Sequence, residues 1–367
     1  MPELRVEASS GSYPVVIEPG VVARVGEWVR EQARGSQVLV VCDHNTAEIA
    51  GSRIAADAGA QVLELDTGEK VKSFEHLQSL CAAAAGAGLA RQSTIVAVGG
   101  GVVGDLAGTA AAIYLRGIHL VQVPTTLLAM VDSSIGGKVG VNLAAGKNLV
   151  GAFKPPLAVF IDPDLLSGLP QREFRSGMAE VIKYGFIADA DLTALLESGG
   201  EAVRRREPAA MLDVIARTCA VQVGVVSRDE KETGERAILN YGHTFAHALE
   251  AASSYSPLLA HGEAVSAGMA VAGRLGVAAG ITPAEVVELQ NRQLAAYGLP
   301  LVSPIHVAVD AVVRALASDK KVEAGTLKWV LLDRLGHATW GHELDQEMVR
   351  EAINAALEGI AAGGAQH

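Results

Sequence analysis

The chain has 367 residues, 50% of them apolar and 19% charged, so it can bury a large core and is long enough for two domains. Its formal net charge of −11 and its 4% aromatic content argue against a nucleic-acid-binding surface and favour small molecules as partners. The three cysteines form no CxxC pair, the N-terminus has no signal pattern and no apolar run reaches membrane-spanning length, so we expect a cytoplasmic protein with no membrane partner.

The first part of the chain alternates short apolar strands with helices. Strict alternation of this kind predicts a parallel sheet covered by helices on both faces. The expected strands are 36–43, 61–66, 94–101, 118–126 and 157–163, and the expected helices are 45–59, 73–89 and 102–117.

The second part of the chain, from about Arg172 onward, is rich in segments with helical spacing. The expected helices are 173–198, 207–227, 239–253, 261–280, 283–297 and 307–317, with one hairpin-like piece at 326–340. The predicted fold is therefore α/β, with an N-terminal parallel-sheet nucleotide-binding domain at 1–165. A mostly α-helical metal- and substrate-binding domain follows at 166–367, and ligands are expected in a cleft between the two.

A glycine-rich segment, "GGGVVGD" (99–105), follows one predicted strand and opens a helix. It matches GxGxxG, a pattern in which the backbone approaches an anion at a helix N-terminus. The loop follows the third strand, and no acidic residue lies about twenty positions on, so a tight turn remains an alternative to a nucleotide site. Gly68, Glu69 and Lys72, at the end of a neighbouring strand, favour a dinucleotide bound in an unusual order.

Histidines recur in the helical part of the chain. His243 and His247 are four residues apart, so they point the same way on a helix, and His261 opens the next predicted helix. Together with the buried-type Glu180 they indicate a metal with an open coordination position, although each histidine alone is compatible with a hydrogen-bonded core residue. Nitrogen and carboxylate ligands without sulfur suit zinc and also accept cobalt or iron.

Basic residues accompany the same segments in this acidic chain. Lys138 and Lys147, the latter beside Asn148, are expected in glycine-rich loops, where they indicate an anion pocket rather than a solvated face. Arg116 and Arg236 extend the set. Lys320 and Lys321 are equally compatible with a solvated run of charge.

These segments together resemble the 3-dehydroquinate synthase family. The resemblance runs from about residue 36 to residue 340 and rests on "GGGVVGDLAG", "VPTTLLAMVDSSIGGKVGVN", "GKNLVGAF", "SGMAEVIKYG", "RAILNYGHTFAHALE" and "HGEAVSAGM". The family is similar in fold to iron-dependent alcohol dehydrogenases and glycerol dehydrogenases. The resemblance implies an NAD-binding α/β domain, a helical domain that binds Zn2+ or Co2+, and a homodimer.

The resemblance also assigns residues by position. The implied metal ligands are Glu180, His243 and His261, and His247 then faces the substrate. The implied catalytic residues are Asp132, Lys138, Lys183, Asn240 and His247. The implied substrate-binding residues are Arg116, Lys147, Asn148, Arg236, Lys320 and Lys321. The implied NAD-binding residues are Asp43, Gly68, Glu69, Lys72, Gly100, Gly101, Val102, Val103, Gly104, Asp105, Thr125, Thr126, Lys138 and Lys147.

The reaction that the resemblance implies converts 3-deoxy-D-arabino-heptulosonate 7-phosphate into 3-dehydroquinate and phosphate, a step of the shikimate pathway, with NAD acting as a catalyst. Two positions depart from the family pattern, because Gln222 stands where a lysine is usual and Gly168 where a threonine is usual. Other sugar-phosphate cyclases, a metal-dependent polyol dehydrogenase and an inactive binding protein remain alternatives. Arg236 and Asn240 favour a substrate with a carboxylate.

Overall fold

The computed structural model describes residues 3–8, 11–143, 146–317, 322–323 and 326–358. The chain divides into two compact units: unit 1 is Met1–Leu169 with Arg206–Glu230, and unit 2 is Pro170–Arg205 with Lys231–His367. From the sequence, a single domain boundary was expected at residue 165. The observed division differs because the segment 206–230 returns to unit 1.

Unit 1 is built on a seven-stranded sheet with strand order β1-β2-β9-β6-β5-β3-β4. The strands β2, β9, β6, β5, β3 and β4 run parallel to one another, and β1 pairs antiparallel with β2. The predicted parallel sheet is therefore confirmed, while the N-terminal pair β1–β2 was not predicted. The strands are β1 (Glu3–Ala8), β2 (Gly11–Ile17), β3 (Val38–Asp43), β4 (Gln61–Leu65), β5 (Thr94–Gly99), β6 (His119–Pro124) and β9 (Ala158–Ile161).

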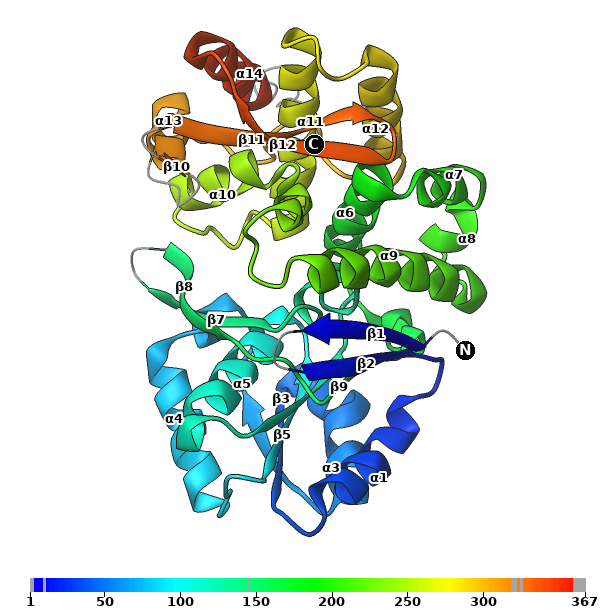
Figure 1. Cartoon of the computed structure of the whole chain (residues 1–367), viewed down its shortest axis with the longest axis vertical. Coiled ribbons are helices and arrows are strands. Elements are labelled where there is room, and N and C mark those ends of the chain that lie inside the picture. Colours follow the sequence, from blue (N-terminus) through cyan, green and yellow to red (C-terminus); the bar gives the residue numbers. More distant parts are fainter. Residues whose placement is uncertain (1–2, 9–10, 144–145, 318–321, 324–325, 359–367) are drawn as a thin grey trace, which may run out of the picture. The chain divides into compact units, whose positions relative to one another are not determined.

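Helices cover both faces of this sheet, as the uninterrupted apolar strands predicted (Figure 1). On one face, Val40, Val96 and Val121 belong to a core shared with helices α1 (Val22–Ala33) and α3 (Ser52–Ala58). On the other, neighbouring strand residues such as Val41, Ile95 and Leu120 join a core with α4 (Phe74–Gly86) and α5 (Gly101–Ile113). Successive side chains of a strand point to opposite faces, so each apolar strand supplies both cores. The short helix α2 (His44–Thr46) and a π-helical turn (Ala47–Gly51) precede α3.

A separate hairpin of unit 1 corrects one expectation. Strands β7 (Lys138–Leu143) and β8 (Gly146–Phe153) pair antiparallel, so Lys138 and Lys147 lie on strands and not in glycine-rich loops. The glycines allow the backbones of β7 and β8 to lie close together, because a Cβ on Gly151 would lie 2.1 Å from the carbonyl oxygen of Val139. Glycine was therefore misleading here, because it marks close backbone contact within a strand pair as well as loops.

Helix α9 (Pro208–Arg228) completes unit 1 by packing against β1 and the π-helical turn Ala129–Ser133. By length and composition alone, it is the one helix in the described ranges that is long and apolar enough to cross a membrane. Half of its apolar window is buried inside the structure, including Val214 and Cys219, as is usual for a core helix.

Unit 2 is mostly helical, as predicted, with a small antiparallel sheet β10-β11-β12. The expected hairpin at 326–340 is confirmed as β11 and β12. The expected helix at 173–198 is two helices, because Asp189 caps the second of them. The elements are α6 (Gln171–Ala188), α7 (Ala190–Ser198), α8 (Gly200–Arg204), α10 (His243–Ala252), α11 (His261–Ala278), α12 (Ala284–Ala296), α13 (Val309–Ala317), β10 (Val322–Glu323), β11 (Thr326–Arg334), β12 (His337–Glu343) and α14 (Gln346–Glu358).

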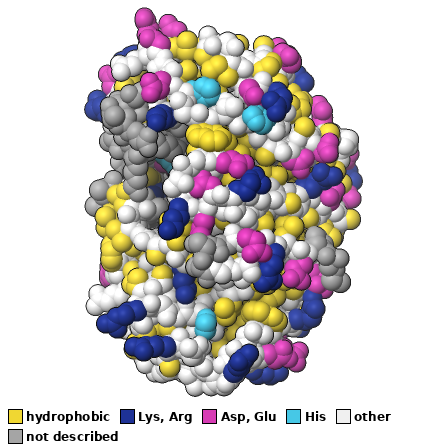
Figure 2. Space-filling model, viewed as in Figure 1, with side chains coloured by type: hydrophobic (Ala, Val, Ile, Leu, Met, Phe, Trp, Pro, Cys, Tyr) yellow, Lys and Arg dark blue, Asp and Glu magenta, His cyan; other side chains and the backbone are white. Residues whose placement is uncertain are grey.

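Charged side chains of both signs are interspersed on the face drawn in Figure 2. The basic side chains drawn there lie scattered among acidic and hydrophobic ones. The acidic excess of the whole sequence, 41 acidic against 30 basic residues, agrees with that distribution.

Candidate active site

Helix α6 places a carboxylate in the interior of unit 2. Glu180 is fully buried, and neither of its carboxylate oxygens accepts a hydrogen bond within the described residues. Lys183, one turn later and equally buried, forms an ion pair with it. A buried ionised carboxylate is costly unless charges or a metal compensate it, and Lys183 supplies one such charge.

Helix α10 brings the first imidazole to Glu180. His243 is the first residue of this helix, and its Nε2 lies 3.4 Å from Oε1 of Glu180. Its Nδ1 lies 3.3 Å from the carbonyl oxygen of Tyr241, which accepts the Nδ1 proton. The preceding Gly242 has φ +80°, and a Cβ there would lie 2.8 Å from the backbone nitrogen of Met269 on α11. Glycine therefore allows the chain to turn into α10 directly against α11.

Helix α11 brings the second imidazole, and two contacts fix where it begins. Glu263 accepts a hydrogen bond from the backbone of Ala260 (2.8 Å) and a forked pair from Arg172 (3.0 and 2.8 Å). Next to His261, the amide of Gly262 donates to Ser176 on α6 (2.9 Å). A Cβ on Gly262 would lie within 2.2–2.6 Å of three backbone atoms of Ser176, so only glycine fits.

The ring of His261 lies between two carboxylates. Its Nε2 is 3.6 Å from Oε1 of Glu180, and its Nδ1 is 3.4 Å from Oε1 of Glu250. Sequence reasoning missed Glu250, which is buried on α10. The available signal was its spacing of seven residues from His243, which places the two on one face of the helix.

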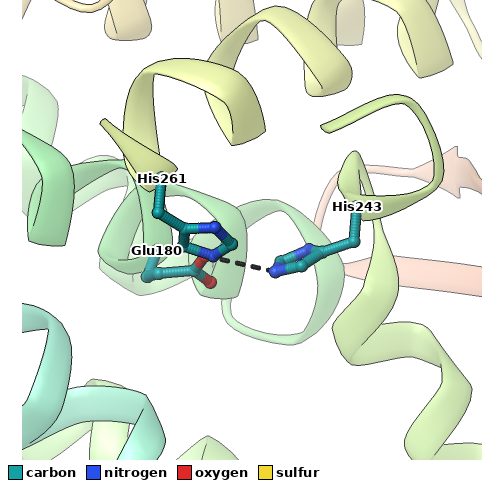
Figure 3. A group of neighbouring side chains, drawn as sticks. All are labelled: Glu180, His243 and His261. Carbon is teal, nitrogen blue, oxygen red and sulfur yellow. Dashed lines mark ion pairs between the residues drawn. The ribbon is translucent and has the colours of Figure 1, made fainter. Parts of the chain in front are cut away.

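Glu180, His243 and His261 form a group with the composition of a metal site (Figure 3). One ligand atom from each lies within 4.8 Å of the others, and Figure 3 shows both rings turned toward the carboxylate. Two nitrogens and one oxygen, with a carboxylate that lacks hydrogen bonds, fit a divalent cation such as Zn2+ or Co2+. Three protein ligands also leave a coordination position for a substrate.

The electrostatics of two of these residues, Glu180 and His243, suit metal binding. Burial raises the pKa of Glu180, but Lys183 and His243 outweigh burial and hold that pKa well below its usual value. Burial, with Lys183, lowers the pKa of His243. An ionised carboxylate and a neutral imidazole are the protonation states that a cation requires.

His247 lies beside this group, one turn further along α10. Its ring centroid is 5.4 Å from that of His243 and 6.3 Å from that of His261, with which it is nearly stacked. Because its side chain is exposed, His247 can meet a bound molecule next to the metal group.

The remaining unit 2 residues singled out from the sequence lie around the start of α10. Arg236 is buried in the 3-10 helix Glu235–Asn240. Asn240 ends this helix and donates to Oε1 of Glu232 (2.5 Å). Lys320 and Lys321 lie outside the described residues.

In unit 1, the glycine loop joins β5 to the N-terminus of α5. A Cβ on Gly99 would lie 2.6 Å from Val103, and one on Gly101 would lie 3.2 Å from Ser133. The N-cap residue of α5, Gly100, has no side chain to cap the first amides of this helix, and such amides are the groups that bind a phosphate in loops of this kind. The loop is a tight turn from β5 into α5, and it also has room for the close approach of a nucleotide pyrophosphate. The sequence alone did not distinguish these two interpretations.

Charged residues surround this loop at the carboxyl edge of the sheet. Lys72 and Asp105 form a mostly buried ion pair, and burial raises the pKa of Asp105 while Lys72 opposes the shift. Glu69 accepts a hydrogen bond from Nδ2 of Asn142 on β7 (2.7 Å). Asp43, at the end of β3, caps the following helix through the amide of Thr46 (2.9 Å). The cap leaves Asp43 at the strand end where a ribose usually binds.

Three further unit 1 positions bear on the predicted substrate residues. The backbone amide of Asn148 donates to Oδ1 of Asn142 (2.9 Å), and Asn148 has φ +54° in β8. Arg116 is exposed and follows Leu115 in a turn where both have positive φ. Gly168, where a threonine was expected, has open space around its Cβ position.

Gln222 in α9 has a definite role in the structure. This buried amide donates to Oδ1 of Asp132 (3.1 Å) and to the carbonyl oxygen of Ile135 (3.4 Å). A glutamine at this position therefore holds the predicted catalytic carboxylate and the adjacent turn through neutral hydrogen bonds, without adding a positive charge.

Comparison with known proteins gives consistent matches. Family models described as 3-dehydroquinate synthase N-terminal and C-terminal match residues 62–176 and 177–322. A 3-dehydroquinate synthase of Nostoc punctiforme is 44% identical over 95% of this chain and 98% of its own length. One from Synechococcus sp. is 44% identical over 96% of this chain and 98% of its own.

Solved structures of sugar-phosphate cyclases are also similar. A 2-deoxy-scyllo-inosose synthase, complexed with carbaglucose-6-phosphate, NAD+ and Co2+, has a TM-score of 0.88 at 27% identity and covers 97% of this chain and 100% of its own. The 2-epi-5-epi-valiolone synthase of Streptomyces hygroscopicus, with NAD+ and Zn2+ bound, has a TM-score of 0.85 at 29% identity with the same coverage. A glycerol dehydrogenase of Schizosaccharomyces pombe, at 18% identity and a TM-score of 0.66, shares the fold.

Proposed function

The chain belongs to the 3-dehydroquinate synthase family, and from this premise we propose that it converts 3-deoxy-D-arabino-heptulosonate 7-phosphate into 3-dehydroquinate and phosphate. The observation that carries the proposal is the group of Glu180, His243 and His261, whose ligand atoms lie within 4.8 Å of one another in the interior of unit 2. A protein that binds no metal gives no reason to bury an ion-paired carboxylate against two imidazoles.

The proposed cofactors are NAD in unit 1 and Zn2+ or Co2+ in unit 2. When bound, NAD accepts a hydride from a secondary hydroxyl and later returns it, while the cation polarises that hydroxyl and the resulting ketone. We assign NAD to the glycine loop at Gly101, with Glu69 and Lys72 beside it. The domain roles expected at 1–165 and 166–367 are kept, with α9 added to the nucleotide-binding part.

In unit 2, the proposed ligands hold the cation, and two neighbours act on the substrate. Lys183 carries a buried ammonium group next to Glu180, and His247 offers an imidazole one turn from His243. Both can donate to phosphate oxygens as negative charge develops on the leaving group. Buried Arg236 is the group proposed to bind the substrate carboxylate.

In unit 1, the proposed catalytic and substrate residues lie on the π-helical turn and on the β7–β8 hairpin. Asp132 is oriented by Gln222 and is the group proposed to meet the reacting hydroxyl. Lys138 and Lys147 extend from the two strands of the hairpin and are proposed to neutralise anionic groups of the substrate or NAD.

We also propose a homodimer located in the cytoplasm. The β7–β8 hairpin exposes Leu149, Val150 and Phe153, and the nearby end of α5 exposes Ile113. Exposed apolar side chains on a two-stranded sheet favour packing against a second copy. Light scattering after size-exclusion chromatography should give the mass of two chains, and Phe153→Glu should shift it toward one.

A cyclase whose substrate lacks a carboxylate is the second candidate function. It is favoured by the likeness to 2-deoxy-scyllo-inosose synthase and by the neutral Gln222 at a usual lysine position. Arg236 argues against it, because a buried guanidinium matches a carboxylate.

The test is release of phosphate from the heptulosonate phosphate, compared with a hexose 6-phosphate, in the presence of NAD and Co2+. We expect release from the first substrate only, without accumulation of NADH. Arg236→Leu should abolish use of the carboxylate substrate, while Arg292→Leu, an exposed residue of α12, should not. Release from the hexose phosphate alone, or NADH formed in step with product, would refute the proposed reaction.

A further inference from the structure

The two ring nitrogens of His261 face different carboxylates. Nε2 lies 3.6 Å from Oε1 of Glu180, on the side where His243 also points its Nε2. Nδ1 lies 3.4 Å from Oε1 of Glu250. The nitrogens of an imidazole point away from one another, so Glu250 lies across the ring from the metal group and is not a fourth ligand of the same ion.

Glu250 reaches His261 from the helix that carries His243. His243, His247 and Glu250 occupy positions i, i+4 and i+7 of α10, which places all three on one face. The side chain of Glu250 is only 5% exposed. A carboxylate this well buried is retained where its charge has a partner, and the imidazole of His261 is one such partner.

The two candidate imidazole ligands share one arrangement. Nδ1 of His243 lies 3.3 Å from the carbonyl oxygen of Tyr241, and its Nε2 faces Glu180. Nδ1 of His261 lies against Glu250, and its Nε2 faces Glu180 as well. In each case an acceptor holds Nδ1 and leaves Nε2 directed at the same carboxylate oxygen.

We propose that Glu250 is the positioning residue of His261. It accepts the Nδ1 proton, fixes the tautomer with the lone pair on Nε2, and holds the ring in the orientation that a cation requires. A carboxylate acceptor also makes the imidazole a stronger donor to a cation than a carbonyl acceptor does. This proposal rests on the proposed metal centre. It adds to that centre a carboxylate–histidine–metal triad, in which Glu250 belongs to α10 and His261 to α11.

The test is a titration of the metal-free full chain with Co2+, followed by the visible absorption of the bound ion. Glu250→Gln and Glu250→Ala should weaken binding by about 10- to 100-fold, as the loss of such partners does elsewhere. Glu288→Gln on α12, which removes the same charge from an exposed position, should leave binding unchanged. Thermal unfolding of each metal-free variant reports any general loss of structure separately.

A second readout separates orientation from a structural effect. In the Co2+-loaded chain, the N–H protons of the two ligated imidazoles should give two paramagnetically shifted proton resonances in water. Glu250→Ala should remove or broaden one of them by exchange with solvent, while the resonance of His243 persists because Tyr241 still accepts its proton.

The outcomes distinguish the two proposals. A wild-type chain that binds no Co2+ would refute the metal centre and the role of Glu250 together. A wild-type chain that binds Co2+, with Glu250 variants of unchanged affinity and two unchanged N–H resonances, would refute the role of Glu250 alone. Weaker binding with loss of one resonance supports it.

Discussion

Replacing Gly262 by alanine tests whether the contact between α6 and α11 sets the position of His261. A Cβ at this position would lie 2.2, 2.4 and 2.6 Å from the O, Cα and C atoms of Ser176, whereas ordinary contacts are 3.4–4 Å. All three atoms belong to the backbone, so a side-chain rotation cannot relieve the overlap. The start of α11 must therefore move by roughly 1 Å away from α6, at a cost of about 1–3 kcal/mol.

The effect on metal binding should exceed the effect on stability. Metal–ligand distances tolerate changes of only about 0.2 Å, and His261 is bonded directly to the displaced residue. Glu180 lies on α6, from which α11 moves away, so the 3.6 Å separation of the two ligand residues must widen. We expect Gly262→Ala to weaken Co2+ binding by about 100-fold or more. This loss exceeds the one expected from replacing Glu250, which contacts His261 but is not a proposed ligand.

The assay pairs a Co2+ titration with thermal unfolding of the metal-free chain. A destabilisation of about 1–3 kcal/mol should lower the midpoint by roughly 2–4 °C per kcal/mol in units of this size. Gly86→Ala is the control, because this helical glycine of α4 has nothing within 4 Å of its Cβ position and should be neutral or slightly stabilising. Wild-type metal affinity in Gly262→Ala would show that α11 does not position the ligand as described.

Three other changes probe the remaining contacts. Burial lowers the pKa of His261, but the neighbouring carboxylates Glu250 and Glu180 outweigh burial and raise that pKa to about 10. Below that pH a cation must displace a proton from His261, so the affinity for Co2+ should rise about tenfold per pH unit between about pH 7 and 9. Calorimetry in buffers of different ionisation enthalpy should count the released proton. Gln222→Leu removes a buried donor from Asp132 and should destabilise the chain by about 1–3 kcal/mol in urea unfolding, whereas an unchanged midpoint would contradict the hydrogen bonds described. Lys72→Met leaves Asp105 without its buried ion partner, so we expect a loss of up to about 3–5 kcal/mol and weaker NAD binding by fluorescence titration; retention of both would count against the assigned loop.

Most of the fold follows from local pattern. Uninterrupted apolar runs such as Val38–Val41 are typical of strands buried on both faces, and the parallel sheet was predicted from them. The antiparallel pair β1–β2 and the β7–β8 hairpin were not, because glycine and alternating polar residues are equally typical of loops. Helix α9 was predicted as a helix, but periodicity does not indicate which unit its apolar side packs against.

The residues of the site were predicted only in part, because spacing along one helix does not indicate contacts with another helix. Spacing along one helix groups His243 and His247, but it does not indicate which imidazole meets a carboxylate from another helix. The separation of Glu180 and His261 along the chain leaves no local signal for their contact, so the ligand set came from resemblance. Glu250 shares the helix face of His243 and was missed because a glutamate in a helix is ordinarily solvent-exposed.

The interrupted course of unit 1 affects how the protein is made. A nascent chain that ends at Leu169 contains every strand of the large sheet but lacks α9, which covers β1 and the turn that carries Asp132. Residues 170–205 of the other unit must leave the ribosome before that cover arrives. At about 5–20 residues per second, apolar surface around β1 stays exposed for several seconds of synthesis, and this interval is where a chaperone would bind.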